Sequence, residues 1–196
     1  MRIILARHGR TLANVQGMIL GRGDSPLTRQ GRAEMVELAR MAAGFEPGRL
    51  YSSSLGRGVE SARILGLELG LVPIPDQGLD ELGCGEWEGS PRLNLLPAGG
   101  ALRPDWNFSP PGGESCLQAE GRVLTSLERI RAECVDDRPA LIMGHAGINR
   151  VVLRLLTGSP PERLLAWTQP HASLVLVQDG DVRQADKSGA IRPGFD

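Results

Sequence analysis

Two histidines follow short apolar runs, and a glycine follows each of them within two residues. His8 comes after residues 3–6 and Arg7, and His145 comes after residues 139–143. An imidazole can act as nucleophile, acid or base near neutral pH, although a single histidine after a strand is more often structural. Arg7 adds a permanent positive charge at the end of an apolar run, where burial requires an anionic partner. Position alone leaves two partners open for Arg7: a bound phosphate or a protein carboxylate.

Alternating strand and helix patterns must position these histidines. Short apolar runs between glycines and prolines predict strands, and apolar residues at helical spacing predict helices. We expect strands at 3–6, 49–52, 71–74 and 139–143, a terminal hairpin over 173–182, and helices over 29–44, 55–70, 116–134 and 148–158. This order indicates an α/β fold, a three-layer α/β/α sandwich with a mostly parallel sheet. In such sheets, ligands collect at the carboxyl ends of neighbouring strands.

Side chains that cap helices mark three of the expected helix starts. Thr28 and Ser54 each precede an amphipathic stretch and can accept a hydrogen bond from its first turn. Ser115 is followed three residues later by Gln118, which is the spacing of a capping box. We therefore expect helices to begin directly after these three hydroxyl residues.

The composition bounds the chain to one globular unit. Its 196 residues are 41% hydrophobic and 23% charged, which is ample material for a core. We expect a single domain, 1–196, with an insertion around 90–112, where the pattern shows little periodicity. The 26 glycines and 14 prolines exceed the usual share of about 12%, so the excess must lie in ordered loops.

Charge and cysteine content exclude several classes of partner. The net charge of −1 gives no reason to expect nucleic acid or an acidic membrane as a partner, because both require a basic face. Three widely spaced cysteines without a CxxC pair indicate neither a disulfide framework nor a structural zinc site. A cytoplasmic protein fits these features best.

Six short motifs follow one another along most of the chain. They are 7–9 with Thr11 and Asn14, 21–28, 53–62, 79–89, 113–115 and 144–147. In this order they resemble the signatures of the histidine phosphatase superfamily, the phosphoglycerate-mutase-like enzymes. One departure is Ser61, where the family has threonine. The resemblance implies a phosphoglycerate-mutase-like fold and an enzyme of the phosphatase type.

The resemblance also implies a role for each catalytic residue. His8 attacks phosphorus as a neutral imidazole and forms a phosphohistidine. Arg7, Arg57 and His145 hold the phosphoryl oxygens, so that fixed cations replace a metal and no cofactor is expected. Glu81 protonates the leaving oxygen and then activates water.

Three carboxylates share the loop that carries the expected proton donor. Glu81, Glu86 and Glu88 are equally placed by position alone, and only the resemblance selects Glu81. A contribution from another of these carboxylates stays open.

The substrate-binding residues implied by the motifs are Asn14, Gly21, Arg22 and Ala146. Asn14 would donate to the transferred phosphoryl group, although an asparagine here could equally cap a loop turn. Ala146 would offer its backbone N–H beyond the second histidine.

Several residues depart from the family pattern, and the losses among them favour hydrolysis over the re-phosphorylation that a mutase performs. Arg10 stands where an acidic residue or glutamine is common, and Ala146 stands where mutases have an asparagine. The mutases' arginine pair is missing as well, and only the isolated Arg92 and Arg103 are available. The chain therefore resembles the small phosphatases, which include α-ribazole phosphatases and broad-specificity phosphatases.

We accordingly expect a metal-independent phosphomonoesterase that acts on a small phosphorylated metabolite, with a homodimer as a further prediction. Three alternatives stay open: an α-ribazole-5'-phosphate phosphatase of cobalamin biosynthesis, a phosphoglycerate mutase, and a catalytically weak protein that binds phosphorylated ligands. The sequence does not select the physiological substrate.

Overall fold

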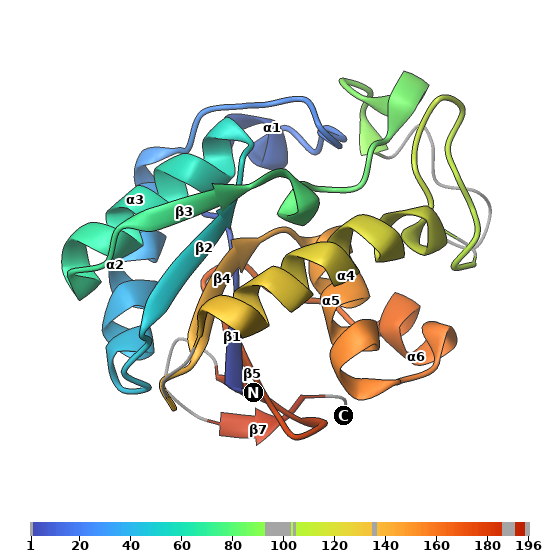
Figure 1. Ribbon diagram of the computed structural model, residues 1–196. Coiled ribbons are helices and arrows are strands. Elements are labelled where there is room, and N and C mark those ends of the chain that lie inside the picture. Colours follow the sequence, from blue (N-terminus) through green and yellow to red (C-terminus); the bar gives the residue numbers. More distant parts are fainter. Residues whose placement is uncertain (1, 93–102, 104, 135–136, 186–190, 195–196) are drawn as a thin grey trace.

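The computed structural model describes residues 2–92, 103, 105–134, 137–185 and 191–194, which form one mixed sheet with helices on both faces (Figure 1). The order of the strands across the sheet is β3-β2-β4-β1-β5-β6-β7. The strands are β1 (Arg2–Arg7), β2 (Arg49–Ser53), β3 (Pro73–Asp76), β4 (Ala140–Gly144), β5 (Leu174–Gln178), β6 (Asp181–Ala185) and β7 (Ile191–Pro193). The three-layer sandwich expected from the sequence is confirmed.

The parallel part of the sheet lies at one side and the antiparallel part at the other. Strands β1 to β4 pair in parallel, whereas β5, β6 and β7 each pair antiparallel to their neighbours. The first apolar run of the chain is therefore a central strand, with β4 on one side and β5 on the other.

Four long helices cover the two faces of the sheet. Helices α2 and α3 pack together on one face, and α4 and α5 pack together on the other (Figure 1). The helices are α1 (Leu12–Val15), α2 (Arg29–Ala43), α3 (Gly56–Leu69), α4 (Cys116–Glu133), α5 (Ala146–Thr157) and α6 (Pro161–Ala166), with short 3₁₀ turns at Gln77–Leu79 and Gly85–Trp87. The sequence patterns missed α1, α6 and β7.

Strand β1 contributes side chains to both hydrophobic cores, because its side chains alternate between the two faces of the sheet. Ile3 and Leu5 pack into the cluster formed with α4 and α5, whereas Ile4 and Ala6 pack into the cluster formed with α2 and α3. All four side chains are buried. A strand that is buried on both faces is held firmly in the sheet. The residues that follow β1 therefore have a defined position.

Two of the three expected helix caps are present. The Thr28 side chain accepts a hydrogen bond from the Gly31 N–H at the start of α2. Ser115 and Gln118 form the reciprocal capping box at the start of α4. These caps are local in sequence, which is why the pattern alone could predict them.

The expected Ser54 cap is wrong. Helix α3 begins at Gly56 after Leu55, which makes no side-chain cap. The Ser54 hydroxyl instead donates to the Asp80 carboxylate, at 2.9 and 3.0 Å. The first turn of α3 is capped from another loop, because Asp24 Oδ1 accepts the Arg57 N–H at 3.1 Å.

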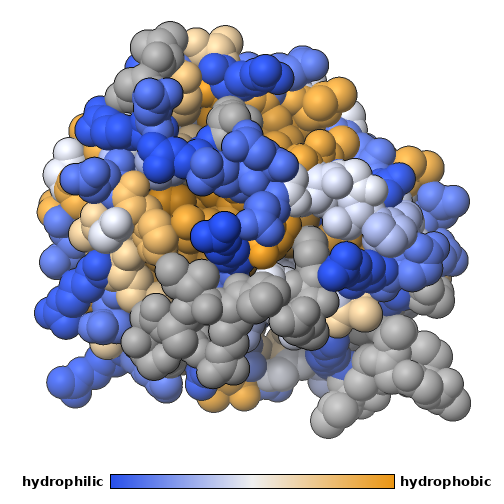
Figure 2. Space-filling model, turned by 90° about the horizontal axis from the view of Figure 1, so that it is seen from below, coloured by the Kyte–Doolittle hydropathy of each residue, from blue (hydrophilic) through white to orange (hydrophobic). Residues whose placement is uncertain are grey.

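Of the expected insertion around 90–112, residues 93–102 and 104 lie outside the described residues. Within the part of the chain that the structure describes, no helix is long and apolar enough to cross a membrane. Figure 2 views the molecule from below, at the end where β1 begins, and hydrophilic and hydrophobic residues are mixed over this face. The carboxyl ends of the parallel strands lie at the opposite end.

Candidate active site

The pairing of β1 with β4 brings the two histidines together. Arg7 lies opposite Gly144 in the parallel register, and the His8 N–H donates to the Gly144 carbonyl at 3.1 Å. His8 and His145 therefore leave the sheet at the same level. Their ring centroids are 5.0 Å apart, and both side chains are buried.

One nitrogen of the His8 ring is tied down. Nδ1 lies 2.8 Å from the Gly9 carbonyl oxygen, and because a carbonyl can only accept, Nδ1 must carry the proton. Nε2 then keeps its lone pair. Burial lowers the pKa of His8 well below its ordinary value, and the nearby His145, Arg57 and Arg7 lower it further. His8 is thus a neutral imidazole with a free Nε2, the state that a nucleophile requires.

Gly9 lets helix α2 approach directly behind this ring. A Cβ at Gly9 would lie 2.5 Å from the Gly31 carbonyl oxygen, which is closer than real Cβ atoms come. The Gly9 N–H donates to Ser61 Oγ at 3.0 Å, and that hydroxyl donates to the Arg57 carbonyl at 2.7 Å. The turn after β1 is thereby joined to the helix that carries the second arginine.

Arg7 and Arg57 are held mainly by neutral carbonyl groups. Arg57 is 1% exposed, and it donates to the carbonyls of Gly23 at 2.6 Å and Gly21 at 2.8 Å. Arg7 donates to the Gln169 carbonyl at 2.8 Å. Burial lowers the pKa of Arg7 to about 10, so it stays a cation near neutral pH. Within the described chain the Nε of each arginine has no hydrogen-bond partner.

Arg7 therefore forms no ion pair with a carboxylate in the described part of the chain, whereas Arg57 has Asp24 at 3.5 Å. The sequence left two partners open for Arg7, a bound phosphate or a protein carboxylate. The described residues provide no carboxylate for it.

His145 stands directly before helix α5, makes no side-chain cap hydrogen bond to it, and is fully buried. Neither ring nitrogen has a hydrogen-bond partner among the residues described. Burial, together with the charges of Arg57, Arg7 and Arg122, lowers the pKa of His145 well below its ordinary value. A buried polar group without a partner costs about 1–3 kcal/mol, and a ligand oxygen beside this ring would remove that cost.

Glu81 lies at the same helix end. Its carboxylate accepts the N–H groups of Ile148 at 2.9 Å and Gly147 at 3.2 Å, and its own neighbour Leu82 donates at 3.0 Å. The first turn of a helix has unpaired N–H groups and partial positive charge, so it holds a carboxylate well. One helix end therefore positions both Glu81 and His145.

The other two carboxylates of this loop, Glu86 and Glu88, lie outside the cavity. Glu88 accepts the N–H groups of Arg22, Gly23 and Cys84 and so joins the loop at 21–23 to the loop that carries Glu81. Neither Glu86 nor Glu88 lines the cavity that Glu81 lines. The geometry thus favours Glu81 among the three, which the spacing alone could not do.

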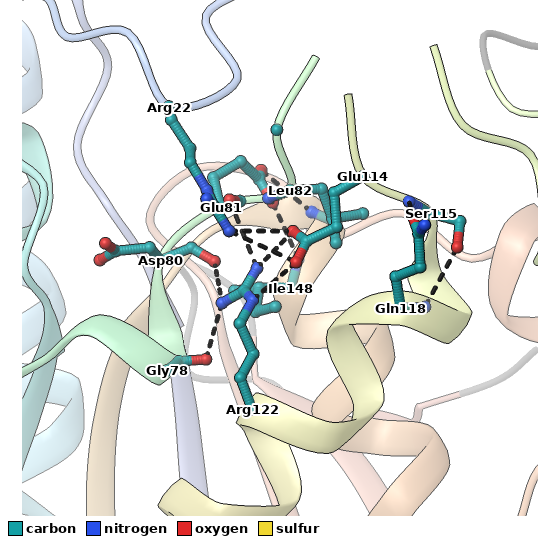
Figure 3. A network of polar contacts seen from close by, with 12 residues as sticks. Arg22, Gly78, Asp80, Glu81, Leu82, Glu114, Ser115, Gln118, Arg122 and Ile148 are labelled. Carbon is teal, nitrogen blue, oxygen red and sulfur yellow. Dashed lines mark hydrogen bonds and ion pairs between the residues drawn. The ribbon is translucent and has the colours of Figure 1, made fainter. Parts of the chain in front are cut away.

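Arg122 of α4 braces the backbone that leads into Glu81 (Figure 3). Its Nη1 donates to the carbonyls of Gly78 and Asp80, each at 2.8 Å, and Nη2 lies 3.5 Å from the Glu81 carbonyl oxygen. Glu114 orients this guanidinium through two contacts, of 3.0 and 2.8 Å. The loop that carries Glu81 is therefore clamped between α4 and α5.

These groups surround a cavity of about 390 Å³. Seven of the nine predicted site residues line it: Arg7, His8, Asn14, Gly21, Arg57, Glu81 and Ala146. His145 does not line the cavity, and its ring packs against that of His8. Arg22 is placed elsewhere, because its half-exposed guanidinium pairs with Glu114 at 3.3 Å.

Asn14 combines the two roles that the sequence left open. Its Oδ1 accepts the Thr11 N–H at 3.2 Å and completes a capping box at α1. Because the oxygen is used by the cap, the Nδ2 donor is left for the cavity that the side chain lines.

Sequence reasoning missed Arg150 and Gln169, and it gave His171 only a structural place or one at the rim of the site. Arg150 also lines the cavity, and its spacing of three and four residues from Gly147 and Ala146 on α5 could have revealed it. His171 Nδ1 lies 3.0 Å from the His8 carbonyl oxygen, and burial lowers the pKa of His171 to about 4. Gln169 and His171 come from a loop without periodicity, so no local sequence signal marks them.

A family model described as histidine phosphatase superfamily (branch 1) matches residues 3–185. The chain belongs to the histidine phosphatase superfamily. This histidine phosphatase is 29% identical over 169 residues to a glucosyl-3-phosphoglycerate phosphatase of Mycolicibacterium vanbaalenii, covering 81% of this chain and 75% of the relative. It is also 29% identical over 174 residues to a 2,3-bisphosphoglycerate-dependent phosphoglycerate mutase of Brucella ovis, covering 83% and 84%.

Among solved structures, a mycobacterial glucosyl-3-phosphoglycerate phosphatase in complex with VO3 superposes with a TM-score of 0.85 at 27% identity, covering 99% of this chain and 98% of that one. The expected enzyme class, a phosphatase of the histidine phosphatase type, is confirmed by these comparisons.

Proposed function

We propose that this chain is a metal-independent phosphomonoesterase that hydrolyses small phosphorylated metabolites through a phosphohistidine at His8. One observation carries the proposal: His8 is a buried, neutral imidazole whose Nδ1 is tied to the Gly9 carbonyl, at a cavity that Arg7 and Arg57 also line. The free Nε2 lone pair and two fixed cations are what an attack on a phosphate requires.

In the first step, His8 Nε2 attacks phosphorus while the bond from phosphorus to the ester oxygen breaks. A proton held on Glu81 passes to the leaving oxygen, so that the alcohol departs neutral. The Nδ1–H remains bonded to the Gly9 carbonyl and keeps the ring oriented. The products of this step are a phosphohistidine, an ionised Glu81 and a free alcohol.

In the second step, water attacks the phosphohistidine. Glu81 takes a proton from that water, the bond from phosphorus to Nε2 breaks, and the electron pair returns to His8. Inorganic phosphate then leaves, and both residues regain their starting protonation. The same carboxylate thus serves as acid and then as base.

The fixed charges replace a metal in this scheme. Arg7, Arg57 and His145 hold the phosphoryl oxygens. Asn14 Nδ2 and the Ala146 N–H donate to them. Removal of one preorganised donor to a developing charge typically costs about 3–4 kcal/mol in the transition state. Because carbonyls hold both arginines in advance, little reorganisation is required when substrate binds.

We further propose that residues 1–196 form one domain and that the protein acts in the cytoplasm. A homodimer stays a prediction. Hydrolysis is favoured over phosphoryl return because Ala146 and Gly147 follow His145, where mutases carry an asparagine. A substrate panel that includes α-ribazole phosphate and 3-phosphoglycerate separates the rivals by the product formed.

Hydrolysis of p-nitrophenyl phosphate in the presence of a chelator tests the proposal. We expect wild-type protein to remain active and His8→Ala to lose at least about a thousandfold in kcat/KM. Glu86→Gln, in the same loop as Glu81 but outside the cavity, is the control and should behave as wild type. Unchanged hydrolysis by His8→Ala would sink the proposal, and so would a wild-type activity that the chelator abolishes and added metal restores.

A further inference from the structure

A pair of buried amide side chains lies next to the end of β1. Asn149 of α5 is 0% exposed, and Gln169, in the loop between α6 and β5, is 1% exposed. Asn149 Nδ2 donates to Gln169 Oε1 at 2.7 Å. Neither side chain lines the active-site cavity, so a part in the reaction would have to be indirect.

Backbone carbonyls fix the orientation of both amides. The Ala6 carbonyl can only accept, so the Asn149 atom that lies 3.1 Å from its oxygen must be Nδ2. The same argument holds for Gln169, whose Nε2 lies 3.2 Å from the Leu5 carbonyl oxygen and 3.3 Å from that of Ser173. All four amide N–H groups of the pair therefore have an acceptor.

The remaining polar atom of Asn149, Oδ1, has no hydrogen-bond partner among the residues described. A Cβ at Gly144, the last residue of β4, would overlap this oxygen, so the amide packs directly against the sheet. A buried acceptor without a partner lowers stability, and a leucine of similar shape would not leave one. Packing alone therefore does not explain this amide, and what it adds is its two N–H donors.

Gln169 ties the end of β1 to the loop that orients Arg7. Its side chain donates to a β1 carbonyl, and its own backbone carbonyl accepts from Arg7 Nη1 at 2.8 Å. Within the part of the chain that the structure describes, this is the one hydrogen bond that the Arg7 side chain makes. His171 of the same loop donates from Nδ1 to the His8 carbonyl at 3.0 Å. A shift of this loop would therefore move Arg7 relative to the nucleophile.

Asn149 brings helix α5 into the same network. The two residues before it, Gly147 and Ile148, give their N–H groups to the Glu81 carboxylate. Through Asn149 Nδ2, the same turn of the helix is bonded to the Ala6 carbonyl at the end of β1. The amide pair thus connects the strand that leads to the nucleophile, the helix that holds the acid, and the loop that orients the first arginine.

We propose that Asn149 and Gln169 are positioning residues, which hold Arg7 in the place where it binds the phosphoryl group. This inference rests on the proposed function, because it takes Arg7 to bind phosphate. Neither residue touches the reacting atoms, and both act through the Gln169 backbone. A misplacement of about 1 Å at an active-site group can cost about a hundredfold in rate.

Phosphate binding without turnover tests this role. Inorganic phosphate is titrated into Gln169→Met, Asn149→Leu and the double variant, and ³¹P NMR gives the Kd. We expect the Kd to rise about tenfold or more in each variant. The double variant leaves neither amide unpaired, so it keeps the test decisive if a single variant fails to fold.

A double-mutant cycle with Arg7 separates positioning from a general loss of structure. If the pair acts through Arg7, Gln169→Met should change the Kd by less than about twofold in the Arg7→Met background. The same cycle is run with the double variant. An equal rise of the Kd in both backgrounds would show a general distortion of the site and would overturn the proposal.

Gln118→Met is the matched control, because Gln118 caps α4 with Ser115 and does not line the cavity. It should lower the urea midpoint of unfolding and keep the wild-type Kd for phosphate. A Kd that rises as much in this control, or a wild-type Kd in the folded double variant, would overturn the role of the pair. Hydrolysis of p-nitrophenyl phosphate that does not depend on His8 would instead overturn the proposed function.

Discussion

The backbone N–H of Ile148 donates to the Glu81 carboxylate at 2.9 Å, which joins the proposed proton donor to the helix that begins directly after His145. Helix α5 therefore holds the Glu81 carboxylate through the N–H groups of its first turn, directly after His145. Any change at this helix end that moves Glu81 should affect proton transfer more than phosphate binding.

Replacement of the acid should show itself through the leaving group. Glu81→Gln keeps the shape of the side chain but cannot donate a proton in the same way, so we expect kcat to fall about 10²–10⁴-fold for alkyl phosphates. The fall should be much smaller for p-nitrophenyl phosphate, whose leaving oxygen needs little protonation. Equal losses for both classes of ester would show that Glu81 does not act as the acid.

A glycine beside Glu81 offers a second way to disturb the same group. A Cβ at Gly147 would lie 2.6 Å from Glu81 Oε1 and 3.0 Å from Leu82 Cδ1. Gly147→Ala should therefore displace the carboxylate and slow alkyl phosphate hydrolysis at least tenfold.

The matched control for this change is Gly121→Ala in α4, because nothing lies within 4 Å of a Cβ at Gly121. It should leave activity unchanged and stabilise the protein by about 0.5–1 kcal/mol, since alanine favours a helix interior. Full activity of Gly147→Ala would contradict the role given to this contact.

Arg122 should act as a positioning residue. Arg122→Met removes the donors to the Gly78 and Asp80 carbonyls, so the Glu81 loop loses its brace from α4. We expect kcat to fall about tenfold or more with little change in KM, and the loss should again be larger for alkyl than for p-nitrophenyl phosphates.

An exposed arginine of the same helix provides the comparison for Arg122. Arg131→Met changes a residue that faces solvent, and its kinetics should match those of wild type. If Arg122→Met slowed both ester classes equally, a general structural role would explain the result better than a positioning role.

Stability should fall as the pH drops below about 6.5. The pKa values of His8, His145 and His171 are all lowered in the folded chain, chiefly by burial. The unfolded chain then binds protons first on acidification, so the stabilisation present above pH 6.5 is lost by up to about 1.4 kcal/mol per pH unit for each histidine.

Urea unfolding between pH 7.5 and 5.5, in buffer without phosphate, measures this dependence. The carboxyls whose pKa values the fold lowers, Asp76 and Glu114, have ordinary values of 3.8 and 4.5, so they titrate below this window. A free energy of unfolding that stays constant from pH 7.5 to 5.5 would show that the histidines are not held neutral.

Local sequence patterns predicted the features that depend on neighbours in the chain. The apolar runs gave β1 and β4, and their parallel register then brought His8 and His145 to one level. Thr28 and Ser115 cap their helices because a cap needs only the next three residues.

Features that depend on distant contacts could not be predicted in this way. Ser54 has the right type and place for a cap, yet Asp80 binds its hydroxyl and Asp24 caps the helix instead. Glu81 could not be told from Glu86 and Glu88 until α5 was seen to hold its carboxylate. These pairings join residues more than 20 positions apart, so no short pattern encodes them.

Trapping of the covalent intermediate tests the central claim most directly. The protein is mixed with a ³²P-labelled phosphomonoester, quenched in alkali during turnover, and digested to locate the label. We predict label on His8 that is stable to alkali and labile to acid, and no label in the His8→Ala variant. Label on any other residue, or turnover without a labelled histidine in a quench that preserves phosphohistidine, would contradict the mechanism.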